Sequence, residues 1–164
     1  MKFLRHFQTK IEPETPVSEW KLSEEGREEM QKFLDENCLN VDKVYTSTEP
    51  KAVETAEKIA KKADAELVKT DLLKEVDRSD EGFVENHDKY IELVENYMRG
   101  GSKAEWESQE EARERFNKFL EQSEEGLAVT HGLILSLNIA AEKDVDPVCF
   151  WKDLGFGEMV EQDF

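Results

Sequence analysis

The chain has 164 residues, of which 38% are hydrophobic, so it is long enough for one domain with a single core. Its formal net charge is -17 at pH 7, from 39 acidic and 22 basic residues. This charge argues against nucleic acid as a partner, because such binding depends on neutralising phosphates with Lys and Arg. It disfavours binding to anionic membrane surfaces for the same reason.

Three sequence features bear on the cellular compartment. No stretch approaches the roughly 18 apolar residues that a membrane helix requires, and residues 1–4 are too short for the apolar core of a secretory signal. Cys38 and Cys149 lie far apart and lack the close spacing of metal ligands. We therefore expect a cytoplasmic protein with structural thiols, no membrane attachment and no metal site.

Three strands and two helices are predicted in the first 70 residues. Ser23 can cap the first helix, in which apolar residues recur at three- and four-residue spacing. Pro50 suits the start of the second helix, which is rich in alanine. The predicted strands cover residues 2–6, 41–46 and 65–69, and the predicted helices cover residues 24–37 and 50–63.

Further helices and strands are predicted after a polar, irregular stretch over residues 74–85. Gly100 and Gly101 indicate a turn between two helices. A short apolar strand over residues 127–130 leads directly into His131 and Gly132. The predicted helices cover residues 87–98, 104–123 and 133–142, and residues 148–164 are predicted to form two strands around a turn at residues 155–157.

Strands that alternate with helices indicate an α/β fold, a three-layer α/β/α sandwich with a mostly parallel central sheet. We expect residues 1–164 to form a single domain of this kind. Ligands of such sheets bind beyond the carboxyl ends of the strands. Polar residues follow three predicted strands, and we expect the topology to bring them into one pocket: Arg5-His6, Thr46-Ser47 with Lys51, and Thr130-His131-Gly132.

These residue types suit chemistry on a phosphate group. Arg5 and Lys51 supply cationic donors, and the helix that begins at His131-Gly132 supplies backbone N–H groups at its positive end. A neutral histidine can attack phosphorus while a second donor stabilises the oxygens and an acid protonates the leaving oxygen. His6, His131 and a carboxylate would complete this set.

The start of the chain resembles that of the histidine phosphatase superfamily, also called the phosphoglycerate mutase-like superfamily. LRHFQT at residues 4–9 is similar to the family's LxRHGxT, with Phe7 in place of glycine. The resemblance implies that His6 is phosphorylated and that Arg5 and Thr9 bind the phosphoryl group. Because Phe7 lacks the backbone freedom of glycine, its side chain must point away from the phosphate or narrow the pocket. We favour the second option, in which Phe7 restricts the substrate.

Two later segments resemble further signatures of the same family. TSTEPKAVETA at residues 46–56 resembles SSxxxRAxxTA, with Lys51 in the place of an arginine, which keeps the charge but loses the bidentate fork. Residues 129–132 resemble the family's strand followed by His-Gly. The resemblance implies that His131 stabilises the transferring phosphoryl group and that Gly132 belongs to the phosphate site.

The family's acid is a glutamate in a segment like LxExDxGxxEG, which residues 73–82 resemble with a gap. Glu75 is our candidate for the acid and base, and Asp77 is the second candidate. The segment with Glu107-Ser108 followed by Arg115-Phe116 resembles the family's GES...RV helix more weakly.

These signatures imply a metal-independent phosphatase without a cofactor, acting on a small phosphorylated substrate or a phosphoprotein through phosphohistidine at His6. The chain is short for the extended capping segments that mutases of this family use, so phosphatase is preferred. Phosphoglycerate mutase and protein phosphohistidine phosphatase stay open. So does a degenerate member that binds a phosphorylated ligand or a partner without turnover, which Phe7 and Lys51 motivate. The sequence leaves the oligomeric state undetermined.

Overall fold

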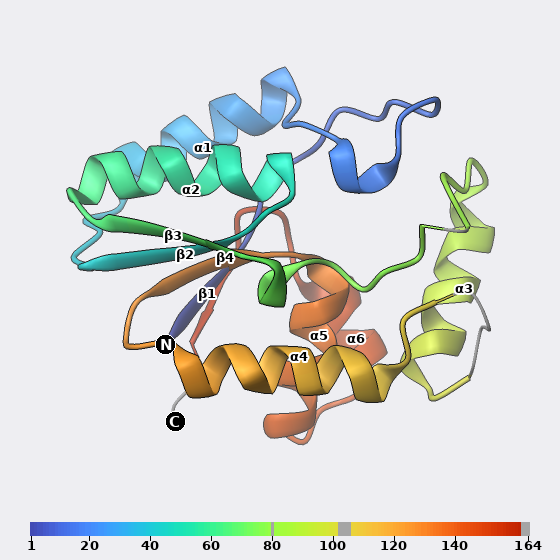
Figure 1. Ribbon diagram of the computed structural model, residues 1–164. Coiled ribbons are helices and arrows are strands. Elements are labelled where there is room, and N and C mark those ends of the chain that lie inside the picture. Colours follow the sequence, from blue (N-terminus) through green and yellow to red (C-terminus); the bar gives the residue numbers. More distant parts are fainter. Residues whose placement is uncertain (80, 102–105, 162–164) are drawn as a thin grey trace.

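The computed structural model describes residues 1–79, 81–101 and 106–161. At its centre lies a five-stranded sheet with strand order β3-β2-β4-β1-β5 (Figure 1). The pairs β3-β2, β2-β4 and β4-β1 are parallel, and β5 pairs with β1 in the antiparallel sense. The strands are β1 Lys2–Arg5, β2 Lys43–Ser47, β3 Glu66–Thr70, β4 Leu127–Thr130 and β5 Met159–Glu161.

Helices cover both faces of this sheet and confirm the predicted α/β sandwich with a mostly parallel sheet. α1 (Glu24–Glu36) and α2 (Pro50–Ala63) lie on one face, above the sheet in Figure 1. The opposite side carries α3 His87–Met98, α4 Gln109–Gln122, α5 Gly132–Glu142 and α6 Pro147–Asp153. Two short 3-10 helices, Val17–Glu19 and Asp71–Leu73, lie in the connections. Among the described helices, none has the length and apolar character needed to cross a membrane.

Local sequence signals explain where several elements begin. The Ser23 hydroxyl accepts the Gly26 N–H at the start of α1, and Pro50 occupies the first turn of α2. Ser108 and Glu111 form a capping box at the start of α4. All four residues of β4 are buried, as expected for a central parallel strand covered on both faces.

The predicted C-terminal strand pair is half wrong. Residues 147–153 form α6, because Pro147 occupies the first turn and the Asp146 carboxylate accepts the Cys149 N–H. The aromatic composition of this segment favoured a strand, but the capping signals decide its structure. α4 also begins later than predicted, after its cap at Ser108; the first residues of the predicted helix, 104 and 105, lie outside the described residues.

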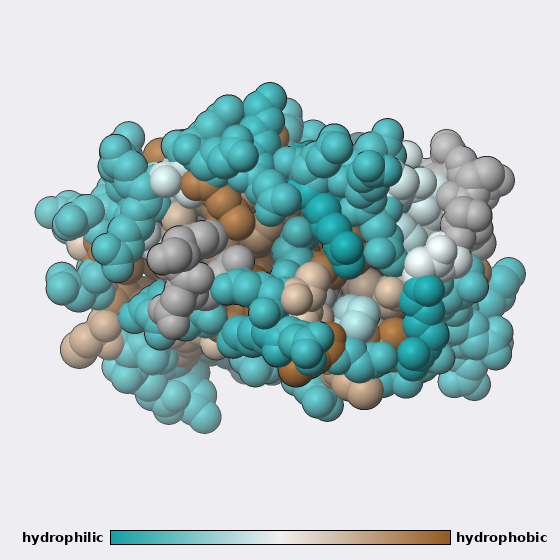
Figure 2. Space-filling model, turned by 90° about the horizontal axis from the view of Figure 1, so that it is seen from below, coloured by the Kyte–Doolittle hydropathy of each residue, from teal (hydrophilic) through white to brown (hydrophobic). Residues whose placement is uncertain are grey.

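The surface agrees with the acidic composition. On the face that is seen from below, hydrophilic side chains predominate and hydrophobic ones form only small areas between them (Figure 2). Cys38 and Cys149 are free and exposed. The high proportion of charged residues is therefore accommodated largely as solvated surface.

Phe7 packs into the core between the sheet and α1. Its side chain is 3% exposed, and its ring meets that of Phe33 edge to face at 5.6 Å. Gly157 lies against the same ring: a Cβ atom there would come within 2.3 Å of Phe7, and Gly157 has φ +68°. Phe7 is thus part of the core, and its burial does not support the hypothesis that it restricts the substrate.

This position predicts a large stability effect for Phe7. We expect Phe7→Ala to lower the free energy of unfolding by about 3 to 5 kcal/mol, because a buried aromatic ring is replaced by a cavity. Ile11→Ala is the control, since Ile11 is 61% exposed and its truncation should change stability by less than about 0.5 kcal/mol. Urea denaturation of both variants measures this, and equal losses would contradict the assignment of Phe7 to the core.

Candidate active site

Parallel pairing of β1 with β4 brings two histidines together at the carboxyl ends of these strands. Arg5 is in register with Thr130, so His6 and His131 follow at the same edge of the sheet. The His6 backbone N–H donates to the Thr130 carbonyl at 3.0 Å, and the imidazole ring centroids are 5.1 Å apart. His6 is 5% exposed and His131 is fully buried. The structure therefore unites two of the predicted site residues across 125 positions of sequence (131 minus 6).

The protonation pattern of His6 is fixed by its own backbone. Nδ1 lies 2.7 Å from the Phe7 carbonyl oxygen, which can only accept, so Nδ1 carries the hydrogen and Nε2 carries the lone pair. Burial lowers the pKa of His6 well below its usual value, and the charges of His131 and Lys51 act in the same direction. His6 is thus a neutral imidazole with its lone pair on Nε2 at pH 7.

His131 forms the N-terminal boundary of α5 and is the less satisfied of the two rings. Neither of its ring nitrogens forms a hydrogen bond within the described part of the chain. Nε2 lies 3.5 Å from Glu49 Oε1. Burial lowers the pKa of His131 well below its usual value, and the charges of Lys51, Arg115 and Arg5 add to this. Buried polar groups without partners are rare, and at this position they indicate a place for a ligand.

Arg5 is held between an aromatic ring and a glycine. Its Cζ lies 4.0 Å from the centre of the Phe156 ring, and a Cβ atom on Gly132 would come within 3.1 Å of Cζ. One guanidinium nitrogen donates to the Leu154 carbonyl, and the buried Nε has no partner among the described residues. Gly132 therefore makes room for the guanidinium, which leaves Arg5 with a donor available beside His6.

Phe156 is a site residue that sequence analysis missed. Its ring is 44% exposed and lies 5.6 Å from the His6 ring as well as over Arg5. The neighbouring Gly157 N–H donates to the carbonyls of Arg5 and His6 at 3.1 and 3.3 Å. The flanking glycines indicated only a turn, and nothing local showed that this turn would cover residues 5 and 6.

Lys51 lies inside the site, but its charge is already paired. It is 4% exposed, and its ammonium donates to Glu49 Oε2 at 2.5 Å and to the Val17 carbonyl at 2.8 Å. Glu49 is 6% exposed, and its Oε1 accepts the Glu75 N–H at 2.9 Å. Glu49 had no role in the sequence analysis; the only signal for one was an acidic residue directly after a buried strand.

Glu75 caps the helix that follows His131. Its carboxylate accepts the N–H groups of Leu133 and Ile134 at 3.0 and 2.8 Å, at the positive end of α5. Burial raises the pKa of Glu75, although these hydrogen bonds favour the ionised form. Asp77, the second candidate, is exposed, and its carboxylate accepts the Ser79 N–H at 2.9 Å. The structure thus brings Glu75, and not the Asp77 carboxylate, to the helix beside the histidines.

The segment that carries Glu75 is anchored by Arg115. Two guanidinium nitrogens of Arg115 contact both carboxylate oxygens of Glu107 at 2.8 and 2.7 Å. The same guanidinium donates to the carbonyls of Leu72 and Lys74, both at 2.9 Å, and to that of Glu75 at 3.3 Å. The weak similarity at Glu107 and Arg115 therefore corresponds to a bidentate ion pair that positions Glu75.

Thr9 was also predicted to bind the phosphoryl group. Its backbone pairs with Leu22 in an isolated bridge, and within the described part of the chain no hydrogen bond joins its hydroxyl to His6 or Arg5. Across the described residues, no group of three or more His, Cys, Asp or Glu side chains is arranged to hold a metal ion.

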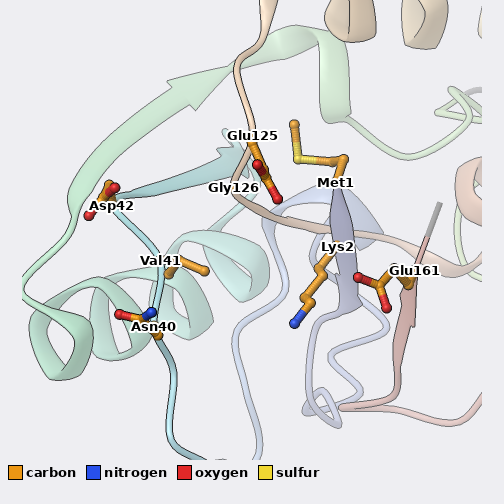
Figure 3. Close-up of a pocket in the computed structure, with 8 residues that line it drawn as sticks. All are labelled: Met1, Lys2, Asn40, Val41, Asp42, Glu125, Gly126 and Glu161. Atoms are coloured by element: carbon orange, nitrogen blue, oxygen red, sulfur yellow. The ribbon is translucent and has the colours of Figure 1, made fainter. Parts of the chain in front are cut away.

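A separate pocket lies at the opposite end of the sheet, near the amino ends of β1 and β2 (Figure 3). Its charged side chains include three acidic groups and one lysine. The lining residues are Met1, Lys2, Asn40, Val41, Asp42, Glu125, Gly126 and Glu161. None of the predicted site residues borders it, so this pocket is distinct from the histidine cluster.

The chain belongs to the histidine phosphatase superfamily (branch 1), whose sequence pattern matches residues 2–154. No curated protein sequence matches the chain. Membership agrees with the resemblance inferred from the ordered sequence signatures.

Solved structures share this fold at low sequence identity. YhfR of Bacillus stearothermophilus has a TM-score of 0.77 at 21% identity, covering 99% of this chain and 90% of its own. The mycobacterial glucosyl-3-phosphoglycerate phosphatase has a TM-score of 0.70 at 15% identity, covering 97% and 87%. A phosphoserine phosphatase mutant from Entamoeba histolytica, in complex with phosphoserine, has a TM-score of 0.69 at 19% identity, covering 96% and 87%.

Burial and the neighbouring positive charges lead us to predict how both imidazoles titrate. As pH falls through about 6.5, where a free histidine protonates, we expect His6 and His131 to stay neutral in NMR spectra of the folded protein. Lys51→Met should raise the pKa of both rings, because it removes a positive charge that lowers each. Glu57→Gln, on the exposed side of α2, is the control. Titration curves that are the same in Lys51→Met and the unaltered protein would contradict this electrostatic coupling.

Proposed function

We propose that the protein is a metal-independent phosphatase that hydrolyses phosphomonoesters through a phosphohistidine at His6. One observation carries this proposal: the Nδ1–H of His6 donates to the Phe7 carbonyl at 2.7 Å, so the lone pair is on Nε2 of a ring that burial keeps neutral. A neutral imidazole with a fixed tautomer is a competent nucleophile. Superfamily membership and the phosphatases among the structural neighbours support the same class of reaction.

In the proposed reaction, His6 Nε2 attacks phosphorus and the bond to the leaving oxygen breaks as Glu75 gives that oxygen a proton. Arg5, Lys51 and His131 donate to the phosphoryl oxygens and stabilise their charge. Water then attacks the phosphohistidine, Glu75 accepts its proton, the N–P bond breaks, and phosphate leaves. The unpartnered N–H of His131 and the unpartnered Nε–H of Arg5 support this arrangement, because phosphoryl oxygens would accept from both.

The proposed substrate is a small phosphorylated compound, with a phosphoprotein as the broader alternative. The Entamoeba histolytica phosphoserine phosphatase binds phosphoserine and 3-phosphoglyceric acid in its solved complexes. Those ligands are the support for a small substrate, which the half-exposed Phe156 beside His6 would contact. A single domain over residues 1–164 and a cytoplasmic location are part of the same proposal.

A second candidate function is phosphate or partner binding without turnover. The ion pair between Lys51 and Glu49 favours it. In a catalytic site the Lys51 charge would bind phosphate, but here Glu49 neutralises it. Phosphate binding by calorimetry, together with no hydrolysis across a broad panel of phosphoesters, would support this second function over the first.

Loss of the nucleophile tests the leading proposal. We expect the unaltered protein to hydrolyse an aryl phosphate in the presence of chelator and to yield a phospho-enzyme that is labile in acid and stable in base. His6→Ala should reduce kcat by at least about 1,000-fold and abolish the phospho-enzyme. His87→Ala, which alters an exposed histidine at the start of α3, is the control. Equal activity in His6→Ala and the unaltered protein would refute the mechanism.

The role of Glu75 is tested by varying the leaving group. Glu75→Gln should lower kcat for alkyl phosphates by about 100- to 10,000-fold, because their leaving oxygen needs a proton. Hydrolysis of an aryl phosphate with a weakly basic leaving group should suffer much less in its first step. Asp77→Asn is the matched control and should behave like the unaltered protein. A larger effect of Asp77→Asn than of Glu75→Gln would reverse the assignment of the acid.

A further inference from the structure

We propose that Glu49 is an internal competitor for phosphate: in the unliganded protein its carboxylate binds the Lys51 ammonium, which the substrate's phosphoryl group requires, and substrate displaces it. This inference rests on the phosphatase site proposed above and adds a residue to it. We expect the protein to bind the phosphate product weakly, because the Glu49 carboxylate returns to Lys51 as phosphate leaves.

The contacts of Glu49 are those of a bound anion. Its Oε2 accepts from the Lys51 ammonium at 2.5 Å, and its Oε1 accepts the Glu75 N–H at 2.9 Å and lies 3.5 Å from His131 Nε2. Lys51 and His131 are two of the three groups that the proposed mechanism assigns to the phosphoryl oxygens. The carboxylate is 6% exposed, so it lies within the site and not at its rim.

The Glu49 side chain does not cap the helix that it precedes. It is the N-cap residue of α2, yet its side chain forms no capping hydrogen bond there. Asp, Ser, Thr and Asn commonly accept a backbone N–H of the following turn at this position. The Glu49 side chain instead reaches into the histidine cluster, so local helix capping does not account for an acidic residue here.

The charge balance explains why competition follows. Arg5 and Lys51 bring two positive charges, and the Glu49 carboxylate already binds one of them, Lys51. A phosphate dianion that enters must replace the carboxylate at Lys51, or lie against it among buried side chains. Like charges at such distances repel strongly at low dielectric. Phosphate therefore binds more weakly with Glu49 in place than with a neutral side chain there.

The opposing interpretation makes Glu49 a positioning residue that holds Lys51 ready for phosphate. The two interpretations predict opposite results for Glu49→Gln. Glutamine keeps the shape and can still accept the Glu75 N–H, but it carries no charge. Under competition, phosphate gains access to Lys51 and binds more tightly. Under positioning, Lys51 loses its partner and phosphate binds more weakly.

The experiment is calorimetric titration of the whole protein with inorganic phosphate, beside steady-state hydrolysis of an aryl phosphate with phosphate as inhibitor. We expect Glu49→Gln to lower both the phosphate Kd and the product inhibition constant by at least about tenfold. Glu57→Gln makes the same charge change on α2 at a side chain that is 54% exposed and pairs with Lys69, and should leave both unchanged. An unchanged or higher Kd in Glu49→Gln would overturn the inference.

A second variant covers the case in which Glu49→Gln does not fold. Glu49→Met keeps the length of the side chain but removes its charge, so no carboxylate remains beside Lys51. It should bind phosphate more tightly than the unaltered protein, and equal or weaker binding would overturn the inference. If the unaltered protein hydrolyses phosphoesters while neither variant binds phosphate more tightly, only the role of Glu49 fails. If no form of the protein binds phosphate or hydrolyses phosphoesters, the proposed function fails with it.

Discussion

The parallel pairing of β1 with β4 is the constraint on which the rest of the site depends. It aligns the ends of two strands that are remote in sequence, so that His6 and His131 lie side by side under the start of α5. Each ring is buried, and burial lowers the pKa of both and keeps them neutral. The chemistry assigned to His6 thus depends on a backbone register more than on any single side-chain contact.

Around this pair, most charged groups are held by other protein groups. Arg115 anchors the segment before Glu75, Glu75 caps α5, and Glu49 joins Lys51 to the Glu75 backbone. The result is a continuous network that connects α2, α4 and α5 at one end of the sheet. Removing one member of such a network lowers the stability of the protein, because it leaves a buried charge without its partner. Unpartnered nitrogens within the described part of the chain remain at His131 and Arg5.

The sequence predicted the sheet and most helices because local signals agree with the tertiary packing, as at Ser23 and Pro50. The ordered signatures also predicted that His6, His131, Lys51 and Glu75 would meet. Contacts that depend on long-range packing were missed. Phe7 replaces a glycine, yet its ring fits the core because the distant Gly157 leaves space for it.

The charge partner of Lys51 was missed for a similar reason. Glu49 is one of many acidic residues in a chain with 39 of them, and only its burial distinguishes it from the solvated ones. The helix at residues 147–153 was mistaken for a strand, because its aromatic content outweighed a cap at Asp146 that was visible in the sequence. The identity of the substrate depends on the shapes of loops, which sequence patterns do not determine.

The ring of Phe156 over Arg5 has a consequence for how this protein folds during synthesis. The Leu154 carbonyl and the Phe156 ring hold the Arg5 guanidinium, yet Leu154 is synthesised 149 residues after Arg5. The central strand β4 is also synthesised long after β1 and β2, so neither of these strands can pair with it until then. Closing such long loops is slow. The site around Arg5 therefore cannot assemble until residues 154–156 have been made, and the groups around the two histidines come together with the whole sheet.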